Sequence, residues 1–478
     1  MARASAAAIL VLLGAVPAPC PAPGAAAEGP PPPGLKALEA LAEEWFRAGD
    51  GEARLAVEEK AAALPPVAPE TVKPISERLF ALARKTGPRL TLKGRATLYA
   101  EPPEPRVTKD PKAKPKDQEL GLYLVTGAKA KSGLLIAMHG GGEGAGDADS
   151  AMGAFGGAAG LGLTVIAPQA IDLVSSAWNE EKQELFVLDL VDAARRTLDV
   201  DTNRVYLAGH SMGGDGSWML GGRHADRVAG AAPLAGSVMP YMRQGKDNRR
   251  ETPRSDYEGL QEGVLPNLLH VPYWIYHSAD DRNEAIHPDD IAVERLKALQ
   301  AKFPGKYEFL YDRVNGMGHA LPKGGVRPIL QWLVKRERDP HPSEVVWETW
   351  GEWKTQMYWL HSRGHAAGWP WRYHAKIVEP NRVEVSGTTK PTAGRTAPKE
   401  MTLSILLAPG LFDFAKPLRV TSGGATLYEG PAPRTFWAML VSIARRNDPQ
   451  QWYEGHVTVK VPRRIWWDLW DPEPEAAK

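Results

Sequence analysis

Short apolar runs alternate with amphipathic segments between about residue 90 and residue 338. The candidate strands include residues 134–138, 163–167, 204–208, 273–277 and 307–311. The amphipathic segments between and after them predict helices over residues 180–198, 289–302 and 326–337. Strands that alternate with helices in this way are typical of a mostly parallel sheet with helices on both faces. The sequence therefore predicts an α/β fold for residues 89–338.

Two regions of different character flank this segment. Leu, Ala and aromatic residues at helical spacing predict helices over residues 35–63 and 71–85, as a short preface that packs on the next domain. After Pro340 come 11 of the 16 tryptophans, among strand-like runs at 382–385, 402–407, 418–421 and 456–461. We expect an N-terminal spacer and helical segment at 28–88, a catalytic domain at 89–338 and a separate, mostly antiparallel β domain at 339–478.

The first 27 residues have the layout of a secretory signal peptide. Arg3 precedes an apolar run at 6–16, and a Pro/Ala-rich stretch ends in three alanines at 25–27. The apolar run is about half of the ~20 residues that a spanning helix needs. We therefore expect export to the periplasm or the medium without a membrane span. The single cysteine, Cys20, lies in the segment to be removed, and Pro17-Ala18-Pro19 before it is a poor match to a lipoprotein signal.

The charge balance excludes some classes of partner. Lys and Arg number 58 and Asp and Glu 57, for a net charge of +1, so no global charge favours nucleic acid or anionic lipid. A mature chain without cysteine has no disulfide, no thiol nucleophile and no Cys-ligated metal.

A candidate nucleophile follows the apolar run 204–208. Residues 209–213 read Gly-His-Ser-Met-Gly, a G-x-S-x-G sequence between a predicted strand and a predicted helix. A sharp strand-to-helix turn would hold the hydroxyl of Ser211 above the sheet edge, with small residues needed on both sides. The backbone N–H of Met212 would then sit at a helix start, where it favours a developing oxyanion.

A glycine run follows the strand at 134–138 and could supply a second oxyanion donor. His139 is followed by Gly140, Gly141 and Gly142, and glycines allow the backbone to turn its N–H groups toward a substrate oxygen. Because the run lacks the Lys-Ser/Thr ending of a P-loop, phosphate binding is the weaker interpretation.

Ser211 needs a base, and the base needs a carboxylate to orient it. His319 is favoured because it lies in a Gly-rich loop directly after the last strand of the α/β segment. The carboxylate is expected in the loop after residues 273–277, where Asp281 is our choice and Asp280 the rival. The order nucleophile, acid, base matches one known arrangement of such triads.

Together these motifs resemble the α/β-hydrolase superfamily, and within it the esterases of the dienelactone hydrolase, feruloyl esterase and polyhydroxybutyrate-depolymerase types. The resemblance covers about residues 90–338. It implies that Gly141 and Met212 form the oxyanion hole, with Gly142 as an alternative to Gly141. The family's acid motif commonly reads H-G-x-x-D, which places the acid at Asp281, four residues after His277, although here a serine stands in the place of the glycine.

The resulting prediction is a secreted serine hydrolase that cleaves carboxylic esters of a small molecule or polymer and needs no metal or organic cofactor. A peptidase of the prolyl-oligopeptidase type would use the same residues, and a non-catalytic binding protein on this scaffold is the third alternative. His361 and His365 have helical metal-ligand spacing, but no H-E-x-x-H pattern accompanies them. The tryptophans after position 340 could stack on sugar rings, although filling the core is the commoner use of such side chains.

Overall fold

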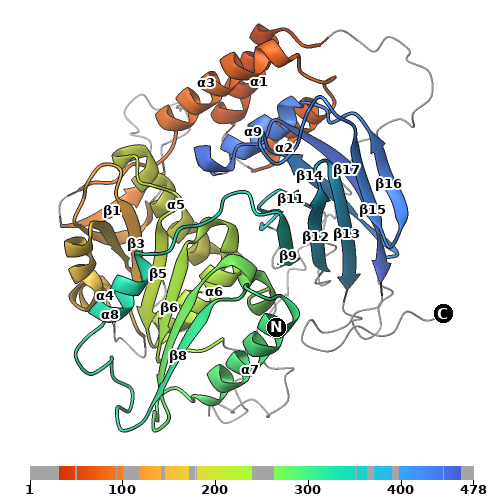
Figure 1. Cartoon of the computed structure of the whole chain (residues 1–478). Coiled ribbons are helices and arrows are strands. Elements are labelled where there is room, and N and C mark those ends of the chain that lie inside the picture. The colour runs from red at the N-terminus through yellow and green to blue at the C-terminus, as the bar shows by residue number, and fades with distance from the viewer. Residues whose placement is uncertain are drawn as a thin grey trace, which may run out of the picture.

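The computed structural model describes a part of the chain, and Figure 1 shows its arrangement. The predicted signal peptide at 1–27 lies outside this part, as do Gly142 and His365. Within the described ranges, no helix is long and apolar enough to cross a membrane. The residues described are 32–48, 51–92, 94–100, 119–141, 146–171, 178, 180–238, 263–349, 353–362, 371–389, 398–444 and 446–464.

The first of two sheets has eight strands in the described residues, in the order β1-β2-β4-β3-β5-β6-β7-β8. From β4 to β8 every neighbouring pair is parallel, whereas β1 and β2 run antiparallel at one edge. This arrangement confirms the predicted α/β class with a mostly parallel sheet. The strands are β1 (Arg95–Tyr99), β2 (Glu119–Thr126), β3 (Gly133–Met138), β4 (Leu163–Pro168), β5 (Val205–His210), β6 (Gly230–Leu234), β7 (Tyr273–Ser278) and β8 (Phe309–Val314).

Helices cover both faces of this sheet. Leu135 and Ala137 of β3 belong to an apolar cluster with residues of α4 and α8, whereas Leu134, Ile136 and Met138 belong to a cluster with residues of α5, α6 and α7. Because successive side chains of a strand point to opposite faces, the two clusters lie on opposite sides of the sheet. The helices are α4 (Ala148–Phe155), α5 (Glu181–Leu198), α6 (Met212–Arg223), α7 (His287–Lys302) and α8 (Arg327–Leu333).

Two strands differ from the sequence expectation. Strand β6, Gly-Ala-Ala-Pro-Leu, was not expected because Gly, Ala and Pro have low strand propensity, yet it is buried along its length between β5 and β7. Strand β8 begins two residues later than the apolar pattern predicts. Tyr307 adopts a left-handed backbone with φ 53°, and its hydroxyl donates to the carbonyl of Pro266, so that extended pairing starts only at Phe309.

The second sheet is mostly antiparallel, as expected for the C-terminal region. Its strands follow the order β10-β11-β14-β17-β13-β12-β9, with β15 paired to β13 and β16 to β15. Only the β13–β15 and β13–β17 pairs are parallel within the described residues. The strands are β9 (Glu344–Glu348), β10 (Gln356–Met357), β11 (Leu360–His361), β12 (Trp371–Glu379), β13 (Arg382–Thr389), β14 (Glu400–Leu407), β15 (Leu418–Ser422), β16 (Ala425–Gly430) and β17 (Gly455–Arg464).

Tryptophans of this region fill its core. Trp347, Trp359 and Trp371 have no exposed surface, and Trp437 is 4% exposed. Buried rings cannot stack on a sugar in solvent, so these four side chains give no support to a sugar-binding surface of tryptophans. Trp437 lies on α9 (Phe436–Ala444), an almost wholly apolar helix that the sequence patterns did not single out.

The N-terminal preface consists of α1 (Leu35–Arg47), α2 (Gly51–Ala62) and α3 (Pro69–Lys85). These helices contact α9 near the other end of the chain (Figure 1). The preface therefore packs on the C-terminal region as well as on the α/β segment that follows it, where the side chain of Arg196 donates to the carbonyl of Ala83.

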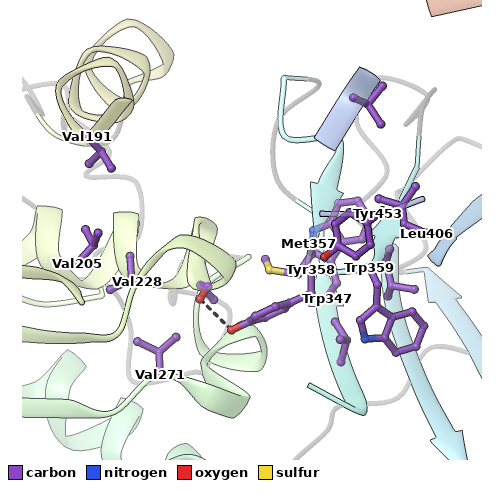
Figure 2. Close-up of a cluster of buried hydrophobic side chains, with 14 of the residues drawn as sticks. Val191, Val205, Val228, Val271, Trp347, Met357, Tyr358, Trp359, Leu406 and Tyr453 are labelled. Carbon is purple, nitrogen blue, oxygen red and sulfur yellow. Dashed lines mark hydrogen bonds between the residues drawn. The ribbon is translucent and has the colours of Figure 1, made fainter. Parts of the chain in front are cut away.

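The two sheets meet across a buried interface. Figure 2 shows Val191, Val205 and Val228 on the side of the first sheet, and Tyr358 reaching toward them from the side of the second. The Tyr358 hydroxyl donates a hydrogen bond of 3.0 Å to the carbonyl of Ala225. A buried phenol requires such a partner, so this contact ties the two regions together.

Candidate active site

Ser211 occupies a strained turn between β5 and α6. Its backbone has φ 58° and ψ −127°, a region that residues with a side chain rarely adopt. The turn is held because the Ser211 N–H donates to the carbonyl of Leu234 in β6 at 2.9 Å. The Ser211 carbonyl in turn accepts from the N–H groups of Gly214 and Asp215 as α6 begins. Strain of this kind costs roughly 1–3 kcal/mol, and it is commonly found at functional sites.

Two glycines around Ser211 are required by close backbone approaches. A Cβ on Gly209 would lie 2.1 Å from the carbonyl oxygen of Gly213, and one on Gly213 would lie 2.2 Å from that of Met138. No side chain fits at such distances. The G-x-S-x-G pattern therefore has a local physical cause in the tight passage of the chain from β5 into α6.

The structure brings Ser211 and His319 together. The Nε2 atom of His319 lies 2.8 Å from the Ser211 hydroxyl oxygen, although the two residues are 108 positions apart. The His319 Nδ1 atom faces a carboxylate, which can only accept, so Nδ1 carries the ring proton and Nε2 is left to accept from the serine hydroxyl. This is the protonation state that a general base requires.

Asp281 is the carboxylate that reaches the imidazole. Its Oδ2 atom lies 2.6 Å from His319 Nδ1, and its Oδ1 atom accepts from the backbone N–H groups of Asn283 and Glu284. Burial alone would raise the pKa of Asp281, but the Glu284 N–H and the His319 imidazole outweigh burial, and the pKa is lowered. Asp281 is therefore an anion at neutral pH.

Asp280, the alternative candidate for the triad acid, does not contact the imidazole and binds the neighbouring loop instead. Its Oδ1 atom accepts from the Ser278 hydroxyl and from the N–H groups of Gly316 and Gly318. The Ser278 hydroxyl also accepts from the N–H of Met317. These contacts fix the loop that carries His319. The serine that replaces the usual glycine of the motif thus has a partner of its own.

Two of the expected oxyanion donors lie side by side. A Cβ on Gly141 would lie 2.3 Å from the sulfur of Met212, which places the glycine run directly against the start of α6. Within the described residues, neither the Gly141 N–H nor the Met212 N–H donates a hydrogen bond to a partner. The third candidate, Gly142, lies outside the described residues.

His139 orients the peptide that leads into Gly141. Its Nε2 atom accepts from the backbone N–H of Ala170 at 3.0 Å, so the ring proton resides on Nδ1, which lies 2.5 Å from the carbonyl oxygen of Gly140. Because the N–H and C=O of one trans peptide point in opposite directions, fixing the Gly140 carbonyl also fixes the direction of the Gly141 N–H. Burial lowers the pKa of His139 and favours this neutral form.

Further residues lie at the site to which the sequence analysis gave no role. His277 and Asp289 lie behind Asp281 and are both buried. His210 lies beside the base, with its ring centroid 4.9 Å from that of His319, and burial together with that neighbour lowers the pKa of His210 to about 4. No motif connects Asp289 with His277, 12 positions earlier, so only the fold could reveal that contact.

No metal centre is apparent in the described ranges, where no group of three or more His, Cys, Asp and Glu side chains could hold an ion. His361 is buried on β11 and meets the ring of Trp437 edge-on at 4.9 Å. Its proposed partner, His365, lies outside the described residues.

Comparison with known proteins gave structural likenesses only. No family model matches the chain, and no curated protein sequence matches it. Among solved structures, a thermostable esterase aligns with 48% of this chain and 62% of its own length, at 20% identity and a TM-score of 0.34. A phospholipase/carboxylesterase from Dyadobacter fermentans aligns with 44% of this chain and 95% of its own length, at 14% identity and a TM-score of 0.33. Dipeptidyl peptidase 4 from Porphyromonas gingivalis aligns with 46% of this chain and 34% of its own length, at 16% identity and a TM-score of 0.32.

Proposed function

We propose that this chain is a serine hydrolase that cleaves carboxylic esters through an acyl-enzyme. One observation carries the proposal: the hydroxyl of Ser211 lies 2.8 Å from His319 Nε2, and His319 Nδ1 lies 2.6 Å from Asp281. A nucleophile, a base and an orienting carboxylate within hydrogen-bond reach are the arrangement that acyl transfer needs. The strained backbone of Ser211 supports the same interpretation, because a serine with only a structural role has no need of it.

In the first half-reaction, the Ser211 oxygen attacks the carbonyl carbon of the ester. A C–O bond forms, the carbonyl becomes an oxyanion, and the hydroxyl proton moves to His319 Nε2. The N–H groups of Met212 and Gly141 receive the oxyanion in this proposal, and a donor of this kind contributes roughly 3–4 kcal/mol of transition-state stabilisation. Asp281 stabilises the imidazolium that forms and does not itself take up the proton.

The tetrahedral intermediate then collapses. The bond between the carbonyl carbon and the alcohol oxygen breaks, and His319 donates its proton to the leaving alcohol. Water repeats the sequence on the acyl-enzyme: it loses a proton to His319, attacks the carbonyl carbon and releases the acid, while Ser211 regains its proton. Every proton transfer uses the same imidazole, which is why its hydrogen bonds on both sides matter.

Esters are chosen over peptides because the motifs resemble those of esterases. The catalytic residues themselves would serve either substrate, since both reactions pass through an acyl-enzyme. A panel of aryl esters and aminoacyl amides separates the two. We expect turnover of the esters, and faster turnover of the amides would assign the chain to the peptidases instead.

A fluorophosphonate probe tests the nucleophile without knowledge of the substrate. The probe forms an O–P bond with an activated serine and releases fluoride, while the serine proton passes to the base. We expect mass spectrometry to find the adduct on Ser211, and Ser211→Ala to abolish labelling. Ser76→Ala, which removes an exposed hydroxyl on α3, should leave labelling unchanged. An adduct retained in Ser211→Ala would remove Ser211 from the mechanism.

A further inference from the structure

A second imidazole–carboxyl pair lies directly behind Asp281. His277 stands near the end of β7 and Asp289 in the first turn of α7, and both side chains are fully buried. His277 Nδ1 lies 2.8 Å from Asp289 Oδ2, and His277 Nε2 lies 3.4 Å from Asp281 Oδ2. One buried imidazole is therefore placed between two carboxyl groups.

Both nitrogens of the His277 ring face oxygen atoms. Besides Asp281, Nε2 lies 3.2 Å from the backbone carbonyl oxygen of Glu284. A carbonyl and a carboxylate only accept, so Nε2 must carry a proton. The doubly protonated ring would donate on both sides, and the carboxylates of Asp289 and Asp281 would balance its charge.

Asp281 shares one oxygen between two imidazoles. The Oδ2 atom that faces His277 is also the atom 2.6 Å from His319 Nδ1. A cation on one side of this oxygen opposes a second positive charge on the other side. His277 therefore acts directly on the carboxylate oxygen that orients His319.

The ionisation behaviour of the pair supports a charged ring. Burial by itself would lower the pKa of His277, but the hydrogen bond and charge of Asp289 outweigh it, and the pKa is raised. Burial raises the pKa of Asp289 to about 6, so Asp289 is mostly ionised at pH 7. The other groups that face the pair are His210 of β5, Trp218 of α6, Glu284 and His319 of the adjoining loops, Asp290 of α7 and Tyr311 of β8.

We infer that His277 is a positioning residue: it is held between Asp289 and Asp281, it fixes the Asp281 oxygen that orients His319, and it thereby sets the acid limb of the site's pH profile. The inference rests on the proposed function, because His319 acts as a base only if Ser211 is the nucleophile. It adds a charge behind the site that extends the working range of the enzyme toward acid.

The pH profile of fluorophosphonate labelling measures this effect. Labelling requires unprotonated His319, so its rate falls on the acid side. In His277→Gln the amide nitrogen can still donate from about the position of Nε2, but it cannot carry charge. Without the neighbouring positive charge, the acid limb of labelling should move to higher pH by roughly 0.5–1 unit. The rate at the alkaline plateau should be largely kept.

Asp289→Asn tests the pair from its other side. The amide is isosteric but uncharged, so His277 loses the anion that keeps it protonated, and the acid limb should move in the same direction. The double variant should move no further than either single one, because both remove the same charge. Asp149→Asn is the control. Asp149 is also an acidic residue in the first turn of a helix, but it lies on α4, where it pairs with Arg95 away from the site, and its loss should leave the acid limb in place.

The outcomes separate the two claims. Wild-type protein that is not labelled at Ser211 contradicts the proposed function. Normal labelling with an acid limb unchanged, or moved to lower pH, in His277→Gln overturns the inference alone. If a variant fails to fold, ¹⁵N-histidine spectra of the full wild-type chain decide the matter. The His277 ring should keep its imidazolium signals to a higher pH than an ordinary histidine does, and a ring that loses them at lower pH would also overturn the inference.

Discussion

Two buried clusters of charged side chains have different roles in this molecule. The site cluster, at the carboxyl edge of the first sheet, comprises Asp281, His319, His277 and Asp289. The interface cluster lies between the two sheets, where Asp226 accepts from Lys354 Nζ at 2.6 Å and also pairs with Arg446. In both clusters a fully buried carboxylate has two cationic or imidazole partners.

The difference lies in the partners. Asp281 faces two imidazoles, whose charge can change near neutral pH. Asp226 faces the guanidinium of Arg446, which keeps its charge at any physiological pH, and the ammonium group of Lys354, whose pKa of about 8 lies above neutral. Burial alone would raise the pKa of Asp226, but Arg446 and Lys354 hold it well below its usual range. A buried carboxylate can thus support proton transfer, as we propose for Asp281, or hold two sheets together, as Asp226 does.

The largest effect that distinguishes the two clusters is expected from Asp281→Asn. The amide can present its N–H to His319 and favour the wrong tautomer, so the ring would no longer accept the serine proton. By analogy with the same change in other triads, the labelling rate should fall about 10⁴-fold. Stability should change far less, because the amide keeps the size and its oxygen can still accept from Glu284. The rate is read from probe labelling and the stability from urea unfolding.

Asp280→Asn is the natural control, because Asp280 was the alternative candidate for the triad acid. Its side chain holds the backbone of Gly316 and Gly318, and an amide oxygen can still accept from them. We expect a loss of rate smaller by at least about tenfold than that of Asp281→Asn. Equal losses would mean that the loop contacts, rather than the imidazole contact, determine the rate.

Asp226→Asn should show the opposite pattern. The change leaves Lys354 and Arg446 as buried cations without their anion, and breaking a buried pair in this way costs about 3–5 kcal/mol of unfolding free energy. The labelling rate of the folded fraction should stay at the wild-type value. Glu379→Gln, which breaks an exposed pair with Arg382, should cost less than about 1 kcal/mol. A large loss of rate in folded Asp226→Asn would contradict the separation of roles.

The sequence predicted those features best whose cause lies within a few neighbouring residues. The turn around Ser211 has a local cause, since the close approaches at Gly209 and Gly213 demand glycine. His319 and Asp281 were expected from chain order and the motif resemblance. The structure places His319 beside Ser211, and Asp281 on the other side of the His319 ring. Their catalytic roles, the export signal and the domain boundaries stay predictions.

What the sequence did not reveal depends on contacts between distant segments. Strand β6 carries no strand propensity of its own and is formed by its neighbours in the sheet. Asp289 reads as an ordinary acidic residue in the first turn of a helix, and its contact with His277 exists only once α7 packs beside β7. The pairing of Asp226 with Arg446 joins residues 220 positions apart, and no pattern in either segment indicates it.

The smallest effect concerns Lys354 and the pH dependence of stability. Burial lowers the pKa of Lys354 to about 8, against 10.5 for an ordinary lysine. The folded chain therefore releases this proton near pH 8, whereas the unfolded chain holds it to about pH 10.5. Between these values the unfolded state binds more protons, so this group makes the unfolding free energy rise with pH. Below pH 8 both states hold the proton and the rise is absent.

Lys354→Met isolates this contribution, because methionine fills similar space without a titrating group. From pH 7.5 to 9.5, the wild type should gain up to about 2 kcal/mol over the variant in urea unfolding. The labelling rate of the folded protein should follow the same pH profile in both, since this proton belongs to the interface cluster. A parallel pH dependence of unfolding in the two proteins would show that Lys354 titrates alike in the folded and unfolded chain. A changed labelling profile would instead show that the interface cluster and the site cluster are coupled, and the contrast between a fixed and a titrating carboxylate would then fail.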